Sequence, residues 1–267
     1  MLMHYRYVAV DIDGTLLDDH DRYDQVRLAK DICALRRQNV TFLIASGNSL
    51  DALQTQFGKL VNNFVAENGG RVVVAEHEIR GVAHRPETLA KLLDYIHCLP
   101  QPDLLSLSAA SQTMIPQKFA SVPVPYYPHH AYFKRLVEIR EPVYNVNVNW
   151  YQRQLPLDQI QQIARTINWT FPEVNATYSG TYGIDILPHG VNKARGLRKF
   201  VQYTGGSMDQ VVAVGDTSND VEMVSAVGLG LAMRNATPDL QSAAAAVTIA
   251  DNNHAGLLRA IEALFSL

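Results

Sequence analysis

Residues 8–18 read Val8-Ala9-Val10-Asp11-Ile12-Asp13-Gly14-Thr15-Leu16-Leu17-Asp18, an apolar run that stops in two aspartates and a glycine. The run is short, β-branched and apolar on both faces, which favours a fully buried parallel strand. Side chains alternate along a strand, so Asp11 and Asp13 can point the same way at its carboxyl end, where open α/β sheets bind ligands. Close carboxylates repel each other unless a cation or a shared proton relieves them, and Mg²⁺ prefers such oxygen ligands. The stretch therefore predicts an acidic, metal-binding strand end.

Two other structures can contain this motif. A calcium-binding loop also begins with Asp-x-Asp-Gly, but it requires glycine at its sixth position and glutamate at its twelfth. Leu16 and Arg22 occupy those positions, which excludes this loop. The second alternative is a capped turn in which the aspartates only accept hydrogen bonds from backbone amides. The motif alone does not separate that turn from a metal site, so the other motifs must decide.

Size and charge narrow the class of protein. The 267 residues are 47% hydrophobic and 18% charged, which allows a substantial core and favours two domains over one. A net charge of -3, without basic runs that interleave with aromatics, argues against a nucleic-acid partner. The chain opens without a leader-like segment and holds no apolar stretch of roughly 20 residues, so we expect no membrane partner and a cytoplasmic location. Cys33 and Cys98 fit no metal spacing and are expected to be reduced, buried thiols in helices.

A second strand-to-helix unit follows the first. Residues 40–45 predict a buried strand, which ends in Ser46-Gly47-Asn48 before an amphipathic helix. Ser46 could serve only as the N-cap of that helix. The same junction also offers a hydroxyl and free amides at a helix N-terminus, which is a suitable site for phosphate.

A third unit near the C-terminus repeats this pattern with carboxylates. Residues 211–215 predict a buried strand, followed by Asp216-Thr217-Ser218-Asn219-Asp220 and another helix. N-capping explains one of these polar residues, but hardly the whole cluster in a strand-to-helix turn. Asp216, Asn219 and Asp220 are therefore candidate site residues.

Lys193 lies in the first turn of the helix that Gly190-Val191-Asn192 opens. A helix N-terminus favours anions, so a lysine there requires a reason. A nearby phosphate would supply one. The alternative is an exposed surface lysine, and the residue taken alone does not decide.

The middle of the chain changes character. Residues 71–74 and 78–82 predict a hairpin. The alternation of buried strands and helices then stops until about residue 183. Asn145, Asn147 and Asn149 alternate with apolar residues, the pattern of an antiparallel strand with one buried face and one wet or ligand-facing side. We expect an inserted antiparallel α+β domain over 83–183 within a core of residues 1–82 and 184–267. Its helices are expected over 87–98, 132–139 and 157–167, and its later strands over 144–150, 169–178 and 182–187.

Four motifs in this order resemble those of the haloacid dehalogenase-like hydrolase superfamily. They are Asp11-Ile12-Asp13-Gly14-Thr15-Leu16, Ser46-Gly47, Gly190-Val191-Asn192-Lys193 and Gly215-Asp216-Thr217-Ser218-Asn219-Asp220. The roughly hundred-residue insert between the second and third motifs resembles the cap of the Cof-type sugar-phosphatase branch, the class called C2B. The resemblance implies an α/β fold, with a Rossmann-like parallel-sheet core and an inserted α+β cap domain.

The resemblance also implies roles for these residues. Asp11 would be the nucleophile and Asp13 the general acid and base. Mg²⁺ would be bound by Asp11, the backbone carbonyl of Asp13, and Asp216. The remaining motif residues fall into two groups: Ser46, Gly47 and Lys193 would bind the phosphate oxygens, and Asn219 and Asp220 would support the metal site.

These roles imply a Mg²⁺-dependent phosphomonoester hydrolase that acts on a small phosphorylated metabolite, with sugar phosphates favoured, through an aspartyl-phosphate. We expect a monomer or a small homo-oligomer. One alternative is a phosphosugar mutase with the same core and cap. Another is a catalytically idle protein that binds Mg²⁺ and a sugar phosphate, which would be expected to lose Asp11 or Asp13.

Two positions depart from the family pattern. Asn48 follows Ser-Gly where arginine is common, and Arg234 replaces a usual glycine. Asparagine cannot make the bidentate anion contact of arginine, so a relative's substrate preference does not transfer. Asn68, near the expected hinge, could reach substrate, although its Asn-Gly pair is chiefly a turn signal.

Overall fold

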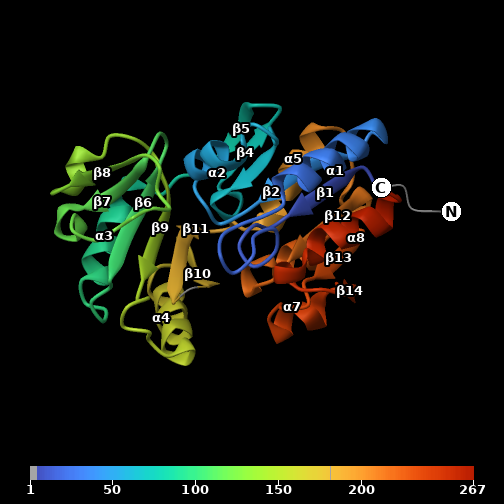
Figure 1. Ribbon diagram of the computed structural model, residues 1–267. Coiled ribbons are helices and arrows are strands. Elements are labelled where there is room, and N and C mark those ends of the chain that lie inside the picture. Colours follow the sequence, from blue (N-terminus) through green and yellow to red (C-terminus); the bar gives the residue numbers. More distant parts are fainter. Residues whose placement is uncertain (1–4, 181) are drawn as a thin grey trace.

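Two β-sheets organise the computed structural model, which describes residues 5–180 and 182–267 (Figure 1). The larger sheet has the order β14-β13-β12-β1-β2-β3-β4-β5. Its first six strands are parallel to one another, and β4 and β5 form an antiparallel hairpin at the edge next to β3. The strands are β1 (Tyr7–Val10), β2 (Thr41–Ala45), β3 (Phe64–Ala66), β4 (Arg71–Val74), β5 (His77–Gly81), β12 (Val211–Gly215), β13 (Leu229–Ala232) and β14 (Ala246–Val247).

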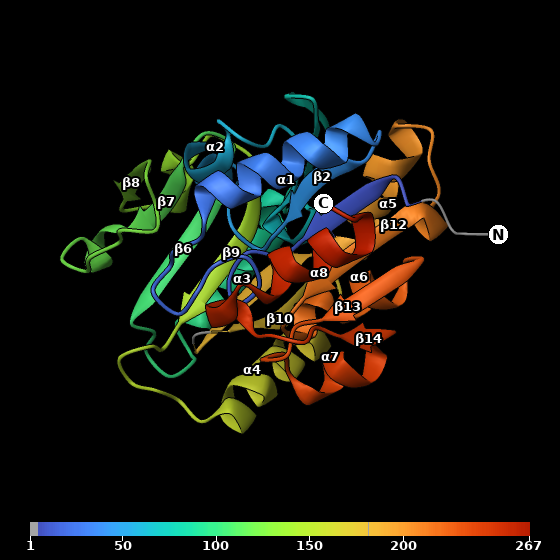
Figure 2. The same cartoon turned by 45° about the vertical axis from the view of Figure 1, so that its right-hand side comes forward.

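Helices cover both faces of this sheet, which explains why its central strands are apolar throughout. On β1, Val8 and Val10 belong to one hydrophobic cluster, and Tyr7 and Ala9 belong to another. α1 and α8 lie together over the first face (Figure 2), and α5 packs against the second. The helices of this part are α1 (Gln25–Arg37), α2 (Leu50–Phe57), α5 (Lys193–Tyr203), α6 (Val221–Ser225), α7 (Pro238–Ala243) and α8 (Gly256–Phe265).

The smaller sheet has the order β10-β11-β9-β6-β7-β8 and lies beside the first in Figure 1. Residues of α3 and α4 contribute to its single hydrophobic cluster, which is separate from the clusters of the core. Its other face is polar, because Ser106 pairs with Asn147 and Asn147 with Asp185 in the strand register. The elements are α3 (Pro86–Ile96), β6 (Leu104–Ala109), β7 (Thr113–Pro116), β8 (His130–Phe133), β9 (Val143–Asn149), α4 (Leu157–Thr170), β10 (Val174–Gly180) and β11 (Gly183–Pro188).

Short 3-10 helices connect several of these elements. They are η1 (Glu67–Gly69), η2 (Gln117–Phe119), η3 (Leu136–Glu138), η4 (Met208–Gln210), η5 (Ser218–Asp220) and η6 (Asn252–His254). Within residues 5–180 and 182–267, no helix has the length and apolar character that crossing a membrane requires.

The predicted fold class is confirmed, but details of the insert are corrected. The helix expected over 132–139 is wrong: residues 130–133 form β8, whose backbone pairs with β7. That pair is parallel, so the sheet is not purely antiparallel. The strand expected from residue 169 begins later, because α4 continues to Thr170. In both places the partner available in the tertiary structure outweighed the local pattern.

The thiols also differ from expectation, since Cys33 and Cys98 are both exposed. Cys33 lies on the outer side of α1, next to the buried Ile32. Cys98 follows the end of α3 at Ile96 and is not within the helix.

The division of the chain requires one change. The expected boundary at residue 183 falls inside the strand expected over 182–187, and this strand, β11, pairs with β9 and β10 in the smaller sheet. We therefore propose that the chain returns to the core after β11, which gives a core of residues 1–82 and 189–267 and a cap of residues 83–188. Residues 1–4 and 181 of these ranges lie outside the described structure.

Gly69 is a point where the fold tolerates no side chain. Its φ is +92°, and a Cβ atom would lie 2.3 Å from the carbonyl oxygen of Asn192, just before α5. We expect Gly69→Ala to lower the free energy of unfolding by about 2–5 kcal/mol, from left-handed backbone strain plus the clash. Urea unfolding followed by circular dichroism measures this change.

Gly205 offers the matched control, with a φ of +72° and no described atom within 4 Å of the place that a Cβ would take. Gly205→Ala should cost only the backbone strain, about 1–2 kcal/mol. Equal losses in the two variants would contradict close packing between Gly69 and the start of α5.

Candidate active site

Three neighbouring parallel strands carry the predicted residues to one edge of the larger sheet. β1 lies between β2 and β12, and Asp11, Ser46 and Asp216 directly follow these three strands. All three side chains are buried. The carboxyl ends of parallel strands meet at one edge, so sequence order is converted into spatial proximity.

Lys193 is the cation of this site. Its Nζ donates hydrogen bonds to Asp11 Oδ1 at 2.6 Å and to Asp220 Oδ1 at 2.7 Å. The side chain is only 1% exposed, so the surface interpretation of this lysine is wrong. Burial lowers the pKa of Lys193, but the charges of Asp11 and Asp220 outweigh burial and raise the pKa above its usual value.

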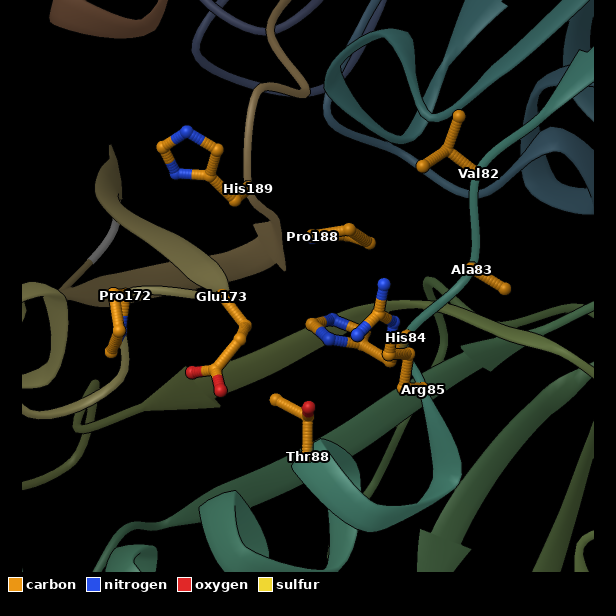
Figure 3. Close-up of a pocket in the computed structure, with 9 residues that line it drawn as sticks. All are labelled: Val82, Ala83, His84, Arg85, Thr88, Pro172, Glu173, Pro188 and His189. Atoms are coloured by element: carbon orange, nitrogen blue, oxygen red, sulfur yellow. The ribbon is translucent and has the colours of Figure 1, made fainter.

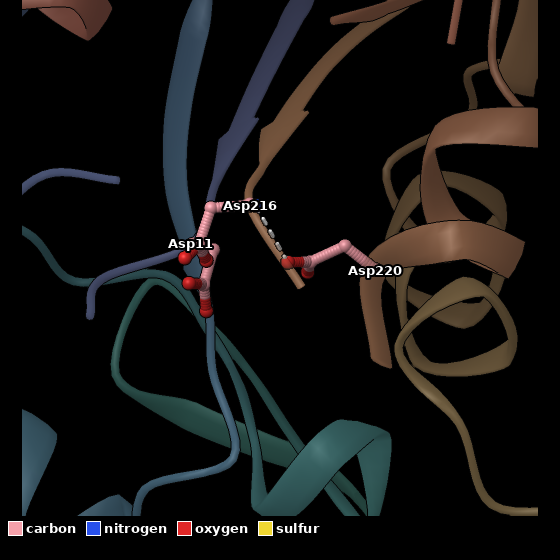
Figure 4. A group of neighbouring side chains, drawn as sticks. All are labelled: Asp11, Asp216 and Asp220. Atoms are coloured by element: carbon pink, nitrogen blue, oxygen red, sulfur yellow. Dashed lines mark hydrogen bonds between the residues drawn. The ribbon is translucent and has the colours of Figure 1, made fainter. Parts of the chain in front are cut away.

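Asp220 joins this lysine to the backbone. Its second oxygen accepts hydrogen bonds from the amides of Asp216 at 3.1 Å and Thr217 at 3.3 Å. Figure 4 shows the bond to the amide of Asp216 as a dashed line. Because both oxygens are occupied, the geometry suits Asp220 to orient its neighbours more than to bind a metal directly.

Asp11, Asp216 and Asp220 form the acidic cluster of the site. Each contributes a carboxylate oxygen, and these oxygens lie within 4.8 Å of one another (Figure 4). Burial raises the pKa of Asp11 to about 7, an effect that Lys193 opposes and Asp220 reinforces. Burial also raises the pKa of Asp216 to about 9, with further increases from Asp11 and Asp220. The site therefore holds more buried negative charge than its own lysine neutralises.

Asp13 has a different environment. Its side chain is exposed to solvent, and its Oδ2 accepts a hydrogen bond from Asn48 Nδ2 at 3.1 Å. The surrounding protein still raises the pKa of Asp13 by desolvation, while the bond from Asn48 opposes this shift. Asn48, noted as a departure from the family pattern, thus contacts the carboxyl group predicted to exchange protons.

Ser46 does not cap the following helix. Ser49 is the N-cap of α2 and accepts a hydrogen bond from the amide of Ala52 at 3.2 Å. Ser46 instead accepts a hydrogen bond from the amide of Asn48 at 3.1 Å, in the loop before the helix. The capping alternative is therefore wrong, and the Ser46 hydroxyl lies in the same loop as Gly47 and Asn48.

Sequence reasoning underrated Asn68 and missed Asp185. Asn68 is 2% exposed, and its Nδ2 donates to Asp185 Oδ2 at 2.8 Å. Its Oδ1 accepts a hydrogen bond from Asn219 at 3.2 Å, so Asn68 links Asp185 of the cap to η5 of the core. The turn interpretation of Asn68 is thus incomplete. The alternating asparagines of β9 were the available signal, since they predicted a ligand-facing sheet.

The cap is held directly against the core near this site. Ser108 of β6 donates to Glu67 Oε1 at 3.0 Å, and Arg71 donates to the carbonyl of Ala110 at 3.0 Å. Glu67 is fully buried, and burial raises its pKa to about 7. These contacts and the bond between Asn68 and Asp185 place the polar face of the cap sheet over the acidic cluster.

A separate cavity of about 350 Å³ lies between the two segments that join the core to the cap, residues 82–85 and 188–189 (Figure 3). His84 is buried beside it, and its Nε2 lies 3.0 Å from the carbonyl oxygen of Ile186. Burial lowers the pKa of His84 to about 4, so the ring is neutral and donates this hydrogen bond. The cavity is lined by Val82, Ala83, His84, Arg85, Thr88, Pro172, Glu173, Pro188 and His189. None of these is a predicted site residue.

This arrangement is a capped α/β core with a buried carboxylate cluster at the ends of its central strands. A family model for haloacid dehalogenase-like hydrolases matches residues 8–261. The chain belongs to that family, and the predicted Cof-type resemblance is confirmed. It is accordingly a phosphatase.

Individual proteins show the same likeness. The chain is 27% identical to 5-amino-6-(5-phospho-D-ribitylamino)uracil phosphatase YbjI of Escherichia coli K12, over 97% of this chain and 96% of that protein. It is 28% identical to a phosphoglycolate phosphatase of Methanosarcina acetivorans, over 99% of this chain and 98% of that protein. A solved HAD/COF-like hydrolase of Plasmodium vivax shares the fold, with a TM-score of 0.87, 16% identity and coverage of 99% and 97%.

The residues present fit the divalent metal ion that this family typically uses. The cluster offers only carboxylate oxygens, the donors that hard divalent cations prefer. Asp220 is occupied by Lys193 and two amides, which leaves Asp11 and Asp216 as the better candidates for metal ligands. Burial is the main cause of both raised pKa values, and the neighbouring carboxylates raise them further.

Lys193→Met tests how strongly the buried cation supports this site. The substitution keeps a long side chain but leaves Asp11 and Asp220 without their common partner. In chelator at neutral pH, we expect the free energy of unfolding to fall by about 3–5 kcal/mol, the usual effect of breaking a buried ion pair from one side. Urea unfolding measures the loss.

Lys199→Met on the exposed side of α5 is the matched control and should change stability by no more than about 0.5 kcal/mol. Adding Asp220→Asn to Lys193→Met should recover part of the loss, because it removes one of the stranded charges. Equal stability of the two lysine variants would contradict the structural importance of this ion pair.

Proposed function

We propose that this phosphatase is a Mg²⁺-dependent phosphomonoester hydrolase that acts on a small phosphorylated metabolite, with sugar phosphates favoured. The observation that best supports this proposal is the position of Asp11. Its carboxylate lies at the end of the central strand β1, bonded through one oxygen to Lys193 and close to Asp216. A carboxylate needs no partner base to act as a nucleophile, and this one has a cation beside it.

In the first step, the free oxygen of Asp11 would attack phosphorus, and the bond between phosphorus and the ester oxygen would break. Asp13 would give its proton to the departing oxygen, which suits an accessible carboxyl group with a raised pKa. The product of this step is an aspartyl-phosphate. Water would then attack phosphorus and give its proton to Asp13, which releases phosphate and restores Asp11.

Three groups would hold the phosphate oxygens during both steps. They are the hydroxyl of Ser46, the amide of Gly47 and the ammonium of Lys193. Charge spreads over these oxygens in the transition state, so donors held in place by the fold act without reorganising. Mg²⁺, held by Asp11, Asp216 and the backbone carbonyl of Asp13, would supply positive charge that screens the nucleophile from the phosphate.

The other functions remain distinguishable. A phosphosugar mutase would return its phosphate to sugar, whereas a hydrolase releases inorganic phosphate. An idle binding protein would be expected to lose Asp11 or Asp13, yet both are present, and Asp11 is bonded to the buried lysine. The relatives are named for different substrates, a ribitylaminouracil phosphate in one and phosphoglycolate in another, so their names alone do not select one for this chain.

Asp11→Asn should abolish metal-dependent phosphate release from a panel of sugar, polyol and cofactor phosphates, because the amide is a poor nucleophile. Asp13→Asn should lower the rate by about 10²–10⁴-fold, the usual contribution of a general acid and base. The measurement is phosphate release with Mg²⁺ and with chelator, together with circular dichroism to verify folding.

Asp94→Asn, on the exposed side of α3, is the control for the same change of charge and should retain activity. Activity that survives in Asp11→Asn would refute the nucleophile assignment. Turnover of sugar phosphates without release of phosphate would favour the mutase.

Metal removal should make stability depend on pH. The pKa values of Asp11 and Asp216 are raised to about 7 and about 9, so without metal both carboxyls favour the folded state when protonated. The melting temperature in chelator should therefore fall as pH rises from about 4 through these values. Mg²⁺ at 100 times its Kd should add about 2.7 kcal/mol to the free energy of unfolding. A fixed Mg²⁺ concentration should stabilise most at high pH, where fewer protons must be displaced and Kd is lower.

Asp216→Asn should shrink both the pH dependence and the stabilisation by Mg²⁺. Differential scanning calorimetry across this pH range, with Mg²⁺ and with chelator, tests the expectation. Identical melting temperatures under the two conditions would show that the cluster binds no Mg²⁺.

A further inference from the structure

Asp185 carries a buried charge that neither the sequence motifs nor the proposed reaction uses. It lies on β11, and its side chain faces the core. Asp185 is only 3% exposed. Within the described structure its carboxylate is held by the side-chain amides of asparagines and not by an ion pair. The Nδ2 atoms of Asn68, Asn145 and Asn147 donate to it at 2.8, 3.0 and 2.8 Å. Burial raises its pKa and the three amides oppose that shift. Burying a carboxylate lowers the free energy of unfolding unless its interactions compensate, so this arrangement indicates a function for Asp185.

The carboxylate lies directly beside the proposed phosphate loop. A Cβ atom built on Gly47 would be 3.0 Å from Asp185 Oδ2. If Ser46 and Gly47 bind the phosphate, the group esterified to that phosphate must extend past this carboxylate toward the cap. Asp185 is therefore placed to contact the part of the substrate that differs from one phosphomonoester to another.

The chemistry of this face favours hydrogen-bond donors. Each amide must turn its nitrogen toward the carboxylate, so its oxygen points elsewhere. The oxygen of Asn68 accepts from Asn219 and that of Asn147 accepts from Asn149, but the buried oxygen of Asn145 has no partner among the described residues. A carboxylate can accept about four hydrogen bonds, and Asp185 accepts three. Hydroxyl groups would satisfy the remaining acceptors, whereas a second anion would be repelled.

We propose that Asp185, together with Asn145, selects substrates whose leaving group is uncharged and carries several hydroxyls, and rejects those whose leaving group bears a carboxylate. This inference rests on the proposed phosphatase site and names its substrate class. The inferred preference distinguishes this chain from the relative that is named a phosphoglycolate phosphatase, because phosphoglycolate carries a carboxylate next to the phosphoester.

The test compares kcat/KM for three substrates in the full chain with Mg²⁺. Ribitol 5-phosphate carries hydroxyls, phosphoglycolate carries a carboxylate, and 4-nitrophenyl phosphate carries neither. Wild type should prefer ribitol 5-phosphate to phosphoglycolate. Asp185→Asn should lose about 10- to 100-fold on ribitol 5-phosphate, the usual effect of losing a hydrogen bond to a charged group. It should gain on phosphoglycolate and stay unchanged on 4-nitrophenyl phosphate.

Asn145→Ala provides an independent variant, because it leaves the bond between Asn68 and Asp185 intact. It should lose about 2- to 10-fold on ribitol 5-phosphate alone, as expected for a neutral hydrogen bond. Asp103→Asn is the matched control in the cap: Asp103 accepts from the amides of Gln152 and Arg153, away from Asp185. Its kinetic constants should equal those of wild type for all three substrates.

The outcomes separate the two levels of the proposal. Equal losses on all three substrates in Asp185→Asn and Asn145→Ala would show that these residues only hold the cap in place, which overturns the inference. A wild type that hydrolyses 4-nitrophenyl phosphate but does not favour ribitol 5-phosphate over phosphoglycolate overturns it as well, while the phosphatase proposal stands. Wild type that releases phosphate from none of the three would overturn both.

Discussion

The buried ammonium of Lys193 is the constraint on which the site depends. One cation faces the three carboxylates of Asp11, Asp216 and Asp220, so the cluster keeps an excess of negative charge after the lysine is counted. Burial, reinforced by this excess, raises the pKa values of Asp11 and Asp216, and the excess also makes the cluster suitable for a divalent cation. The cost of burying these charges is offset only when all the partners are in place.

Lys193 also fixes the position of residues that it does not contact. Asp220 bonds to Lys193 through one oxygen and to the amides of Asp216 and Thr217 through the other. The turn after β12 is therefore positioned from α5, a helix that begins where the chain returns from the cap. Close packing at Gly69, where a Cβ would strike the residue before α5, supports the same helix from the other side. The site is complete only when both parts of the core have assembled.

The cap contributes a different kind of surface. Its sheet buries one face against α3 and α4, and its polar face meets the core through Asn68, Glu67 and Arg71. Asparagines on that face are not simply solvated, since two of them hold the carboxylate of Asp185. The polar face of the cap is rich in hydrogen-bond acceptors and lies next to the acidic site of the core. A ligand that enters between the two domains must therefore offer hydrogen-bond donors to this face.

Local sequence determined a large part of this protein. Apolar runs predicted the central strands, and the aspartates and the serine that follow them indicated the candidate site, because a parallel sheet brings the carboxyl ends of its strands together. Only the tertiary structure decided that Lys193 is buried and that residues 130–133 form a strand beside β7. It also decided the partner of Asn68, which lies 117 residues away in Asp185. Burial and pairing of this kind depend on residues far apart in the chain, and a local pattern carries no information about which distant partner will be present.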